Sequence, residues 1–503
     1  MSAPRSAATS RSPRRAVAAA LLLAAAGQVH ADSNAAKVAG PQPGPAREVR
    51  FPAFEEQTLP NGLRVVVVQQ HEQPLVSLQL LVKAGKSFEP AGKQGLAKAT
   101  AALLTQGTAT RAAQQVAAAI DFVGGTLSTG ASVEAGFASI ATTSDQLDLA
   151  FELLADVILH PSFPQDEIDR WRKQTLDGLR IKSKTAGYLA NTAFLRTLFG
   201  EHPYGRPADG TAESLAALSR EDFVAFHRER YVAGQALIAV VGDVTPADAF
   251  ARVRRAFAGW AQGTPVEVPA VSTAASSARR ILVIDKPDAA QTEIRLGQTA
   301  IAFRDPDLYV AEVYNSLVGK SSSARLNEEL RVRRGLTYGA SSSFTEPSQP
   351  GWFVASTSTK TASTVTAVTV ALDVLGGLST EAVPAAELAS AKTFITGALP
   401  LEIETAAGTA GKVLEAMRAG YGRDFLEHYN EHLSGVTAVD LQRFARERMH
   451  PDTMTVVLVG NAAAFAQELR EKLGAFETVP AAKLDFLRSD LRTAETDPAP
   501  PPH

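Results

Sequence analysis

Hydrophobic and polar positions along this chain follow two periods, one typical of strands and the other of helices. Short apolar runs bounded by turn residues predict strands over 64–69 and 76–84. The second run alternates loosely and ends at Gly85, so we expect the two strands to form an antiparallel pair. Apolar residues spaced three and four apart predict helices over 96–106, 112–123, 144–159 and 166–183.

One succession of elements occurs twice. A polar helix with a buried stripe leads into an apolar strand and a glycine, first over 219–242 and again over 440–460. The matching positions are all 218 residues apart: Asp222/Asp440, Phe226/Phe444, Arg228/Arg446, Glu229/Glu447, Arg230/Arg448 and Gly242/Gly460. A shared register of this kind indicates an internal duplication. We therefore expect an α+β fold with two homologous halves, each with antiparallel sheets backed by helices.

Composition places the boundaries of these halves. Pro265, Pro269 and a Ser/Thr/Ala run interrupt the pattern in the middle of the chain, and the C-terminal end is rich in proline. The predicted segments are a signal peptide at 1–31, a flexible lead at 32–50, a first half at 51–262, a linker at 263–278, a second half at 279–476 and a disordered tail at 477–503.

The N-terminal segment has the layout of a secretory signal. Basic residues at 11–15 precede an apolar run at 16–27, and Val29-His30-Ala31 supplies a small-x-small cleavage site. We expect cleavage after Ala31 and residence in the periplasm of a Gram-negative bacterium, with secretion from the cell as the alternative. The run is too short for a stable membrane span and no other stretch approaches that length, so no membrane anchor is expected after cleavage.

Overall charge and cysteine content exclude several classes of function. The 503 residues carry a formal net charge of −3, which offers no basic surface for nucleic acid. The chain has no cysteine, which excludes disulfides and a thiol nucleophile.

The most informative motif lies on the first predicted helix, at 95–108. It reads Gly-Leu-Ala-Lys98-Ala-Thr-Ala101-Ala102-Leu-Leu-Thr-Gln-Gly-Thr. This segment resembles the helix of pitrilysin/insulinase-type zinc peptidases, whose frame is G-L-A-H-x-x-E-H-x-x-x-x-G-T. Lys98, Ala101 and Ala102 occupy the positions of the His, Glu and His. Alanine has no donor atom and lysine brings a cation, so this degenerate zinc slot is not expected to bind metal.

A literal H-x-x-E-H occurs elsewhere, at His428, Glu431 and His432. The duplication would place a second metal helix near 98 + 218 = 316 instead, and no glutamate follows the motif at the spacing that the family uses for its third ligand. We interpret this motif as coincidental, on an exposed amphipathic helix whose buried stripe contains Phe425, Leu426, Tyr429 and Leu433. A self-sufficient zinc site built on His428 and His432 is the weaker alternative.

A second resemblance to the same family lies in the second half, where Leu330-Arg331-Val-Arg-Arg-Gly335-Leu336-Thr-Tyr338 is similar to the family segment L-R-x-x-x-G-L-x-Y. In that family the Arg and the Tyr reach across a chamber to the zinc-bound substrate. The resemblance therefore implies that Arg331 and Tyr338 bind substrate and stabilise an oxyanion. The alternative is structural, with Arg331 paired to Glu328 or Glu329 and Tyr338 capping a sheet edge.

Together these resemblances, which extend over about 51–476, imply a fold of two halves arranged as a clam around a chamber. They also imply the bacterial two-chain type of this family. In that case this chain is the subunit without zinc of a periplasmic metallopeptidase that degrades or processes peptides. A homologous partner subunit would supply the zinc and the intact H-x-x-E-H, and this chain alone would be nearly inactive. The alternative is a non-enzymatic peptide-binding or assembly protein on the same fold.

Overall fold

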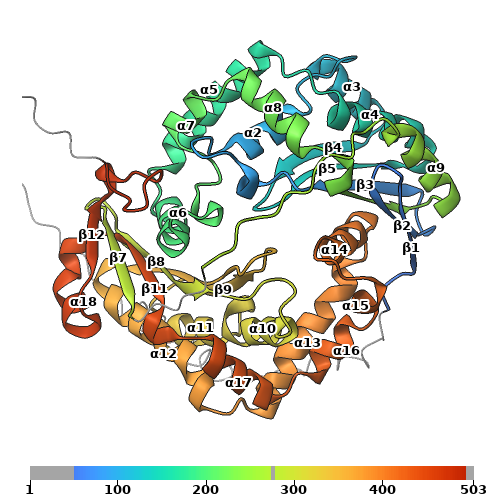
Figure 1. Ribbon diagram of the computed structural model, residues 1–503. Coiled ribbons are helices and arrows are strands. Elements are labelled where there is room, and N and C mark those ends of the chain that lie inside the picture. The colour runs from blue at the N-terminus through green and yellow to red at the C-terminus, as the bar shows by residue number, and fades with distance from the viewer. Residues whose placement is uncertain (1–49, 273–277, 494–503) are drawn as a thin grey trace, which may run out of the picture. The chain divides into compact units, whose positions relative to one another are not determined.

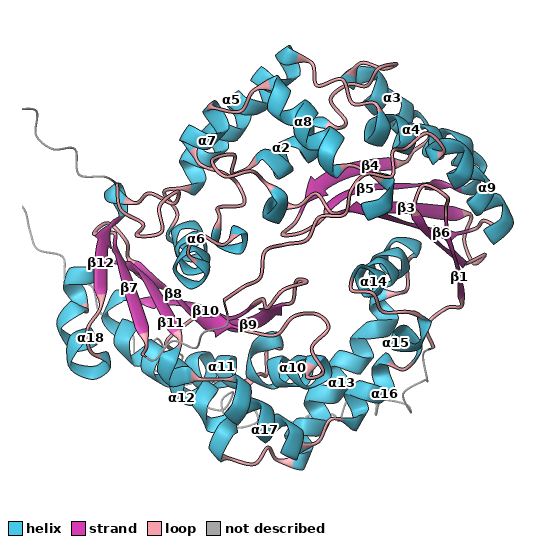
Figure 2. Cartoon of the chain, viewed as in Figure 1, coloured by secondary structure: helices cyan, strands magenta, loops and turns pink. Residues whose placement is uncertain are grey.

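The computed structural model describes residues 50–272 and 278–493, and these residues form two six-stranded sheets with helices around them (Figures 1 and 2). The expected signal peptide, and all but the last residue of the expected lead, lie outside the described residues.

The first half contains β1 (Phe54–Thr58), β2 (Arg64–Gln69), β3 (Leu75–Val82), α2 (Leu96–Leu103), α3 (Ala113–Phe122), β4 (Thr126–Ala131), β5 (Gly136–Thr143), α4 (Leu147–Leu159), α5 (Gln165–Lys182), α6 (Ala186–Phe199), α7 (Ala212–Ala216), α8 (Arg220–Arg230), β6 (Ala236–Gly242) and α9 (Pro246–Phe257). The four helices that the periodicity predicts correspond to α2, α3, α4 and α5, each within three residues of the expected bounds at either end.

The second half contains β7 (Arg280–Asp285), β8 (Gln291–Thr299), α10 (Leu308–Asn315), α11 (Arg325–Asn327), β9 (Ala340–Thr345), β10 (Trp352–Lys360), α12 (Thr364–Thr380), α13 (Ala385–Glu402), α14 (Ala406–Arg418), α15 (Arg423–Glu427), α16 (Tyr429–Gly435), α17 (Ala438–Arg448), β11 (Thr455–Gly460), α18 (Ala466–Leu473) and β12 (Glu477–Pro480). A π-helical turn follows α10 at Ser316–Lys320, and another follows α11 at Glu328–Arg333.

The two sheets have the same topology, which confirms the two homologous halves. Their strand orders are β1-β2-β6-β3-β5-β4 and β12-β7-β11-β8-β10-β9, so five strands match one for one in the same order. The repeated helices also match at the predicted spacing, since α8 starts at Arg220 and α17 starts at Ala438, 218 residues later. Only the outermost strands β1 and β12 come from opposite ends of the chain.

The expected antiparallel pair of neighbouring strands is wrong in one respect. β2 and β3 do run in opposite directions, but β6 lies between them, parallel to β2 and antiparallel to β3. Each sheet is therefore mixed, because β11 likewise lies parallel to β7 and antiparallel to β8. The physical reason is burial: every residue of β6 is buried, and a fully buried strand needs a hydrogen-bonding neighbour on both sides.

The halves are held together by a reciprocal exchange of helices. α14, from the second half, packs on β3 and β6 of the first sheet, whereas α6, from the first half, packs on β8 and β11 of the second. These helices are themselves equivalent, because α6 starts at Ala186 and 186 + 218 = 404, two residues before α14 starts at Ala406. Each sheet thus has one face that a helix of the opposite half covers.

Small and apolar residues make these contacts. On α6, Ala190, Ala193 and Phe194 are buried, and on α14, Ala410 and Val413 are fully buried. Strands β7 and β11 contribute residues to the same hydrophobic core as α6, and β2 and β6 share a core with α14. Alanine on these faces lets helix and sheet approach closely, so the exchange buries apolar surface from both halves.

A buried carboxylate adds a polar link between the halves. Glu134, in the β4–β5 turn, is 8% exposed. It accepts hydrogen bonds from the Tyr204 hydroxyl at 2.6 Å and from the Ser348 backbone N–H at 3.0 Å, and it forms an ion pair with Arg418 at 3.2 Å. Ser348 and Arg418 both belong to the second half, so this carboxylate fixes the separation of the two halves at the turn.

The expected disordered tail at 477–503 is wrong for the residues that the structure describes. β12 pairs in parallel with β7, and Val479 and Leu491 are each 1% exposed. Arg196 of α6, which is also buried, donates hydrogen bonds to the backbone carbonyls of Leu487 and Arg488. Most of the prolines that suggested disorder lie in residues 494–503, which are outside the described range.

One helix outside the signal region does reach the length and apolarity of a membrane span, contrary to expectation. This stretch, Thr361–Thr380, includes α12. α12 packs against α17, and Val368, Ala371 and Leu378 are buried in the core of the second half. Its apolar composition therefore suits a core helix of this fold.

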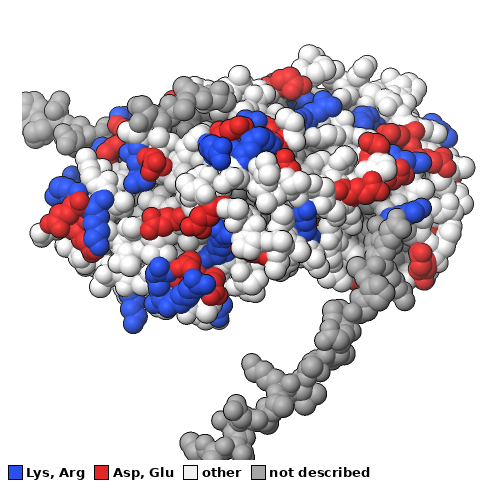
Figure 3. Space-filling model, turned by 90° about the horizontal axis from the view of Figure 1, so that it is seen from below, with Lys and Arg blue, Asp and Glu red and all other residues white. Residues whose placement is uncertain are grey.

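On the face shown in Figure 3, basic and acidic side chains lie interspersed and neither sign forms a continuous field.

The helix exchange leads to a prediction about stability. Phe194→Ala should lower the free energy of unfolding by about 3–5 kcal/mol, because it leaves a cavity between α6 and the second sheet. Phe122→Ala is the matched control, since that side chain is 90% exposed, and it should change stability by no more than about 0.5 kcal/mol. Equal midpoints of chemical denaturation for the two variants would contradict the assigned role of α6.

Candidate functional site

The helix that carries the degenerate zinc slot is positioned by a buried glutamate. α2 begins after Gly95, whose φ of 92° lies in the left-handed region where glycine is favoured. Glu89 Oε1 accepts hydrogen bonds from the backbone N–H groups of Gly95, at 3.1 Å, and Ala97, at 2.9 Å. Burial raises the pKa of Glu89 to about 8, and burial lowers the pKa of the neighbouring Lys86 to about 8. The start of α2 is therefore fixed by the protein's own hydrogen bonds.

An ion cluster occupies the position of the metal ligands. Lys98 Nζ is paired with Asp209, and Lys182 Nζ from the end of α5 lies 2.7 Å from the other carboxylate oxygen of Asp209. Burial alone would raise the pKa of Asp209, but the hydrogen bonds from Lys182 and Lys98 hold it below its ordinary value. Two lysines thus share one carboxylate, and one of them, Lys98, stands at the position of the first motif histidine.

The chemistry of these residues does not fit zinc. Ala101 is fully buried and offers no donor atom, and Lys98 brings a positive charge that its carboxylate partner already neutralises. On the long helix α5, Asp177 is paired with Arg180 at 2.9 Å, and the last residue, Lys182, supplies a cation to the cluster. Among residues 50–272 and 278–493, no three His, Asp or Glu side chains gather as a metal-binding set.

The equivalent position in the second half lies where the duplication predicts it, at the junction of α10 and the π-helical turn 316–320. Its side chains serve the fold. Asn315 Oδ1 accepts a hydrogen bond from the Ser342 hydroxyl of β9 at 2.7 Å, and the Ser316 hydroxyl donates to the Ala391 carbonyl at 3.1 Å.

The literal H-x-x-E-H motif does not form a site either. His428 lies at the break between α15 and α16, with its two ring nitrogens 2.9 Å from Glu431 and 3.4 Å from Asp424. The hydrogen bond to Glu431 raises the pKa of His428, which favours the protonated imidazolium over the neutral ring that a metal needs. His432 instead stacks on Tyr309, with ring centroids 4.7 Å apart. Leu426 and Leu433 are buried as the predicted stripe requires.

The structure brings Arg331 and Tyr338 together. The Arg331 guanidinium lies 5.2 Å from the centre of the Tyr338 ring, a cation–π contact. Arg331 lies in the π-helical turn 328–333, and such turns are frequent at functional sites. Tyr338 follows in the loop before β9 and is 90% exposed.

Carboxylates close to Arg331 are engaged by other arginines. Glu328 pairs with Arg333, and Glu329 pairs with both Arg333 and Arg334. Among the described residues Arg331 has no carboxylate partner, and the Tyr338 hydroxyl has no hydrogen-bond partner. This arrangement disfavours the structural alternative for the pair.

The backbone on either side of Tyr338 is anchored to the sheet. Thr359 of β10 donates to the Leu336 carbonyl at 2.6 Å, and Thr357 donates to the Gly339 carbonyl at 3.0 Å. The Thr337 hydroxyl also donates to Gly339, at 2.9 Å. An exposed side chain on a fixed backbone is what preorganised contact with an external group requires.

Sequence reasoning missed three residues of the emptied slot: Asp209, Lys182 and Glu89. Asp209 is 111 residues from Lys98, and no local pattern joins them. Glu89 precedes the predicted helix by several residues, outside the usual position of a capping side chain. The contacts that fill the slot come from tertiary structure alone.

Two domain profiles of one peptidase family match this chain. The profile described as "Insulinase (Peptidase family M16)" matches residues 64–211, which include the emptied slot. The profile described as "Peptidase M16 inactive domain" matches residues 217–394, which include Arg331 and Tyr338.

Individual relatives that match this chain are described as zinc proteases. A zinc protease of Mycobacterium tuberculosis, itself described as uncharacterised, is 27% identical over 438 residues, covering 86% of this chain and 100% of the relative. A similarly named protein of Mycobacterium leprae is 28% identical over 395 residues, covering 78% and 88%.

The crystal structure of a peptidase M16 inactive domain from Pseudomonas fluorescens superimposes with a TM-score of 0.77 at 27% identity, over 81% of this chain and 98% of that one. A protease from Helicobacter pylori shares the fold, with a TM-score of 0.75 at 22% identity, over 82% of this chain and 100% of that one. The matching profiles, the relatives and the shared fold show that this chain belongs to the insulinase-type M16 family of peptidases, as a member whose own zinc motif is degenerate.

Proposed function

We propose that this chain is the subunit without zinc of a heteromeric periplasmic metallopeptidase, and that a homologous partner carries the zinc and an intact H-x-x-E-H. The observation that carries the proposal is the exposed pair Arg331 and Tyr338 on an anchored segment, in a chain whose own slot holds Lys98, Asp209 and Lys182 in place of a metal. The pair can serve a metal site only if another chain supplies that site.

Each residue of the pair has a definite task in this proposal. The Tyr338 hydroxyl, which has no acceptor among the described residues, is free to donate to the oxyanion that forms when water attacks a peptide carbonyl. The Arg331 guanidinium offers a planar, permanently charged fork to a substrate carbonyl or carboxylate. Its cation–π contact holds the guanidinium beside the phenol ring, so one peptide segment can meet both groups.

The edge strands of the two sheets support the proposal that the substrate is a peptide. β4 and β9 are the last strands of their sheets, and each pairs with one neighbour only. An extended peptide can add to such an edge through its backbone, which gives affinity with little dependence on sequence. The predicted signal peptide supports the periplasmic location.

The first prediction concerns metal content. The purified mature chain should contain no stoichiometric zinc by mass spectrometric metal analysis, and His428→Ala should leave its metal content unchanged. The complex with the partner should contain one zinc per partner subunit. A chelator should abolish peptide hydrolysis by the complex without dissociating it. Stoichiometric zinc in the isolated chain, lost on His428→Ala, would contradict the proposal.

The second prediction concerns turnover. Tyr338→Phe should lower kcat of the reconstituted complex by about 100-fold, the typical loss for one oxyanion donor, because it removes only the hydroxyl. KM and the sedimentation coefficient of the complex should not change.

The matched control is Val332→Ala, which trims a side chain that is 63% exposed on the same segment and carries no donor. It should leave kcat unchanged. Unchanged turnover in Tyr338→Phe would instead favour the alternative, a non-enzymatic peptide-binding or assembly protein.

A further inference from the structure

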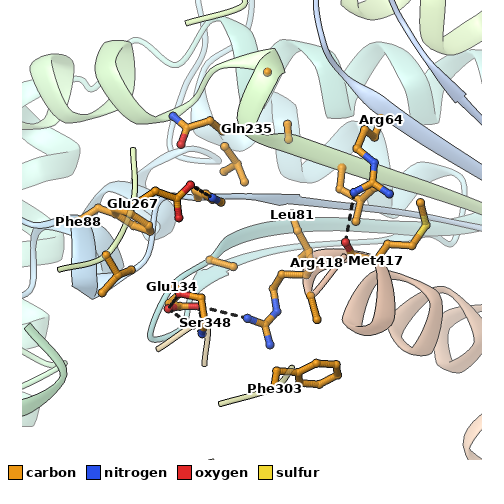
Figure 4. Close-up of a pocket in the computed structure, with 18 of the residues that line it drawn as sticks. Arg64, Leu81, Phe88, Glu134, Gln235, Glu267, Phe303, Ser348, Met417 and Arg418 are labelled. Carbon is orange, nitrogen blue, oxygen red and sulfur yellow. Dashed lines mark hydrogen bonds and ion pairs between the residues drawn. The ribbon is translucent and has the colours of Figure 1, made fainter. Parts of the chain in front are cut away.

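A cavity of about 310 Å³ lies between the first sheet and the second half (Figure 4), and its lining includes neither the ion cluster around Asp209 nor Arg331 and Tyr338. The ends of β3 and β6 and the β4–β5 turn form one wall. The loop after β8 and the end of α14 form the other, and Glu267 and Val268, which precede β7, close a third side. The cavity is therefore built from both halves and depends on their being held together.

The charged side chains of this cavity are predominantly basic. Arg64, Lys83, Arg304 and Arg418 line it, against the carboxylates of Glu134 and Glu267, which leaves a formal charge of 4 − 2 = +2. Lys83 is neutralised by Glu267 at 2.9 Å. Arg64 donates a hydrogen bond to the Met417 carbonyl and also pairs with Glu56 at 3.8 Å, whereas Arg304 donates a hydrogen bond to the Gly420 carbonyl, which does not cancel its charge.

Arg418 is the central cation. Its guanidinium projects between Glu134 and Phe303 in Figure 4, with Nη1 3.2 Å from Glu134 Oε2 and its centre 5.7 Å from the Phe303 ring centre. Among the described residues, its Nε and Nη2 atoms have no hydrogen-bond partner. An arginine has five N–H donors, so this one keeps a free edge of parallel donors beside a fixed partner.

Most of the remaining lining is apolar, although Gln235 and Ser348 add polar groups. Leu81, Phe88, Leu237, Val268, Phe303 and Met417 supply most of it. A pocket with a few directed polar groups on an apolar lining is typical of sites for small organic ligands. This combination requires a ligand with one charged end and a hydrocarbon body.

We propose that this cavity binds a monoanionic carboxylate attached to an apolar side chain, with the carboxylate on the free edge of Arg418. A planar carboxylate matches the geometry of a guanidinium fork. The fixed carboxylate of Glu134 disfavours a dianion such as phosphate more strongly than a monoanion at the same position, because its repulsion of the ligand grows with the ligand's charge. Two sources carry this chemistry: the C-terminal residue of a peptide and a free fatty acid.

This proposal is independent of the zinc-bearing partner, because the cavity lies within one chain. It can therefore be tested on the isolated mature chain by isothermal titration calorimetry with EDTA present. The probes are N-acetyl-phenylalanyl-leucine, the same dipeptide with a C-terminal amide, and decanoate.

The dipeptide acid, decanoate or both should bind. If a peptide is the ligand, the dipeptide amide should bind at least about tenfold more weakly than the dipeptide acid, because the amide lacks the charge that Arg418 recognises. Binding of the dipeptide acid without decanoate identifies a peptide C-terminus, and binding of decanoate alone identifies a fatty acid. No heat from either carboxylate, or equal affinity of dipeptide acid and amide, would overturn the proposal.

Two variants locate the site. Arg418→Gln should weaken binding by about tenfold or more by removing the charge. Leu81→Trp should also weaken binding by about tenfold or more, because the larger side chain fills the cavity. This variant keeps the ion pair of Arg418 and Glu134, so weaker binding in it does not come from loss of that link between the halves. Arg180→Gln is the control, because that arginine lies on α5 outside the cavity and its side chain is 73% exposed. Equal affinity in all three variants would overturn the assignment of the site.

Discussion

The reciprocal packing of α6 and α14 is the contact on which the rest of this structure depends. Each sheet has an apolar face that the helices of its own half do not cover, and exposing such a face to water is unfavourable. Because α6 and α14 are equivalent elements of the duplicated unit, both sheets are covered by the same type of helix–sheet contact. Neither half can complete its core alone, so the residues that line the space between the halves have fixed relative positions.

The fold is therefore held by contacts that do not involve a metal. α2 is held by the hydrogen bonds that backbone N–H groups at its start donate to Glu89 and by burial of its apolar side, and neither contact needs zinc. Lys98 and Lys182 are each 55% exposed in their side chains, so their pairing with Asp209 is expected to contribute no more than about 1 kcal/mol. The cluster therefore fills the slot without stabilising the fold greatly. The segment around Tyr338, by contrast, is anchored to β10 and leaves the side chain exposed.

Local patterns predicted the helices and the duplication, because both depend on consecutive or regularly spaced positions. The resemblance to the family motif pointed to Lys98, Ala101 and Ala102. The placement of β6 between β2 and β3 could not be predicted in this way, since it joins residues about 170 positions apart and pairing over such distances leaves no local signal. The same holds for Asp209, for Glu134 and for the segment from Glu477 to Thr493. That segment looked disordered by composition but pairs with β7 and binds Arg196. Sequence also indicated that Arg331 and Tyr338 act together, but only the structure shows that neighbouring arginines occupy the nearby glutamates.

The most direct test of the account is capture of the mature chain, carrying an affinity tag, from the periplasm of its native cell, followed by mass spectrometry of the proteins bound to it. If the site is shared, a chain of similar size with an intact H-x-x-E-H should be recovered in a constant ratio to the tagged chain. Recovery of the tagged chain by itself, or with partners that lack this motif, would contradict the shared site.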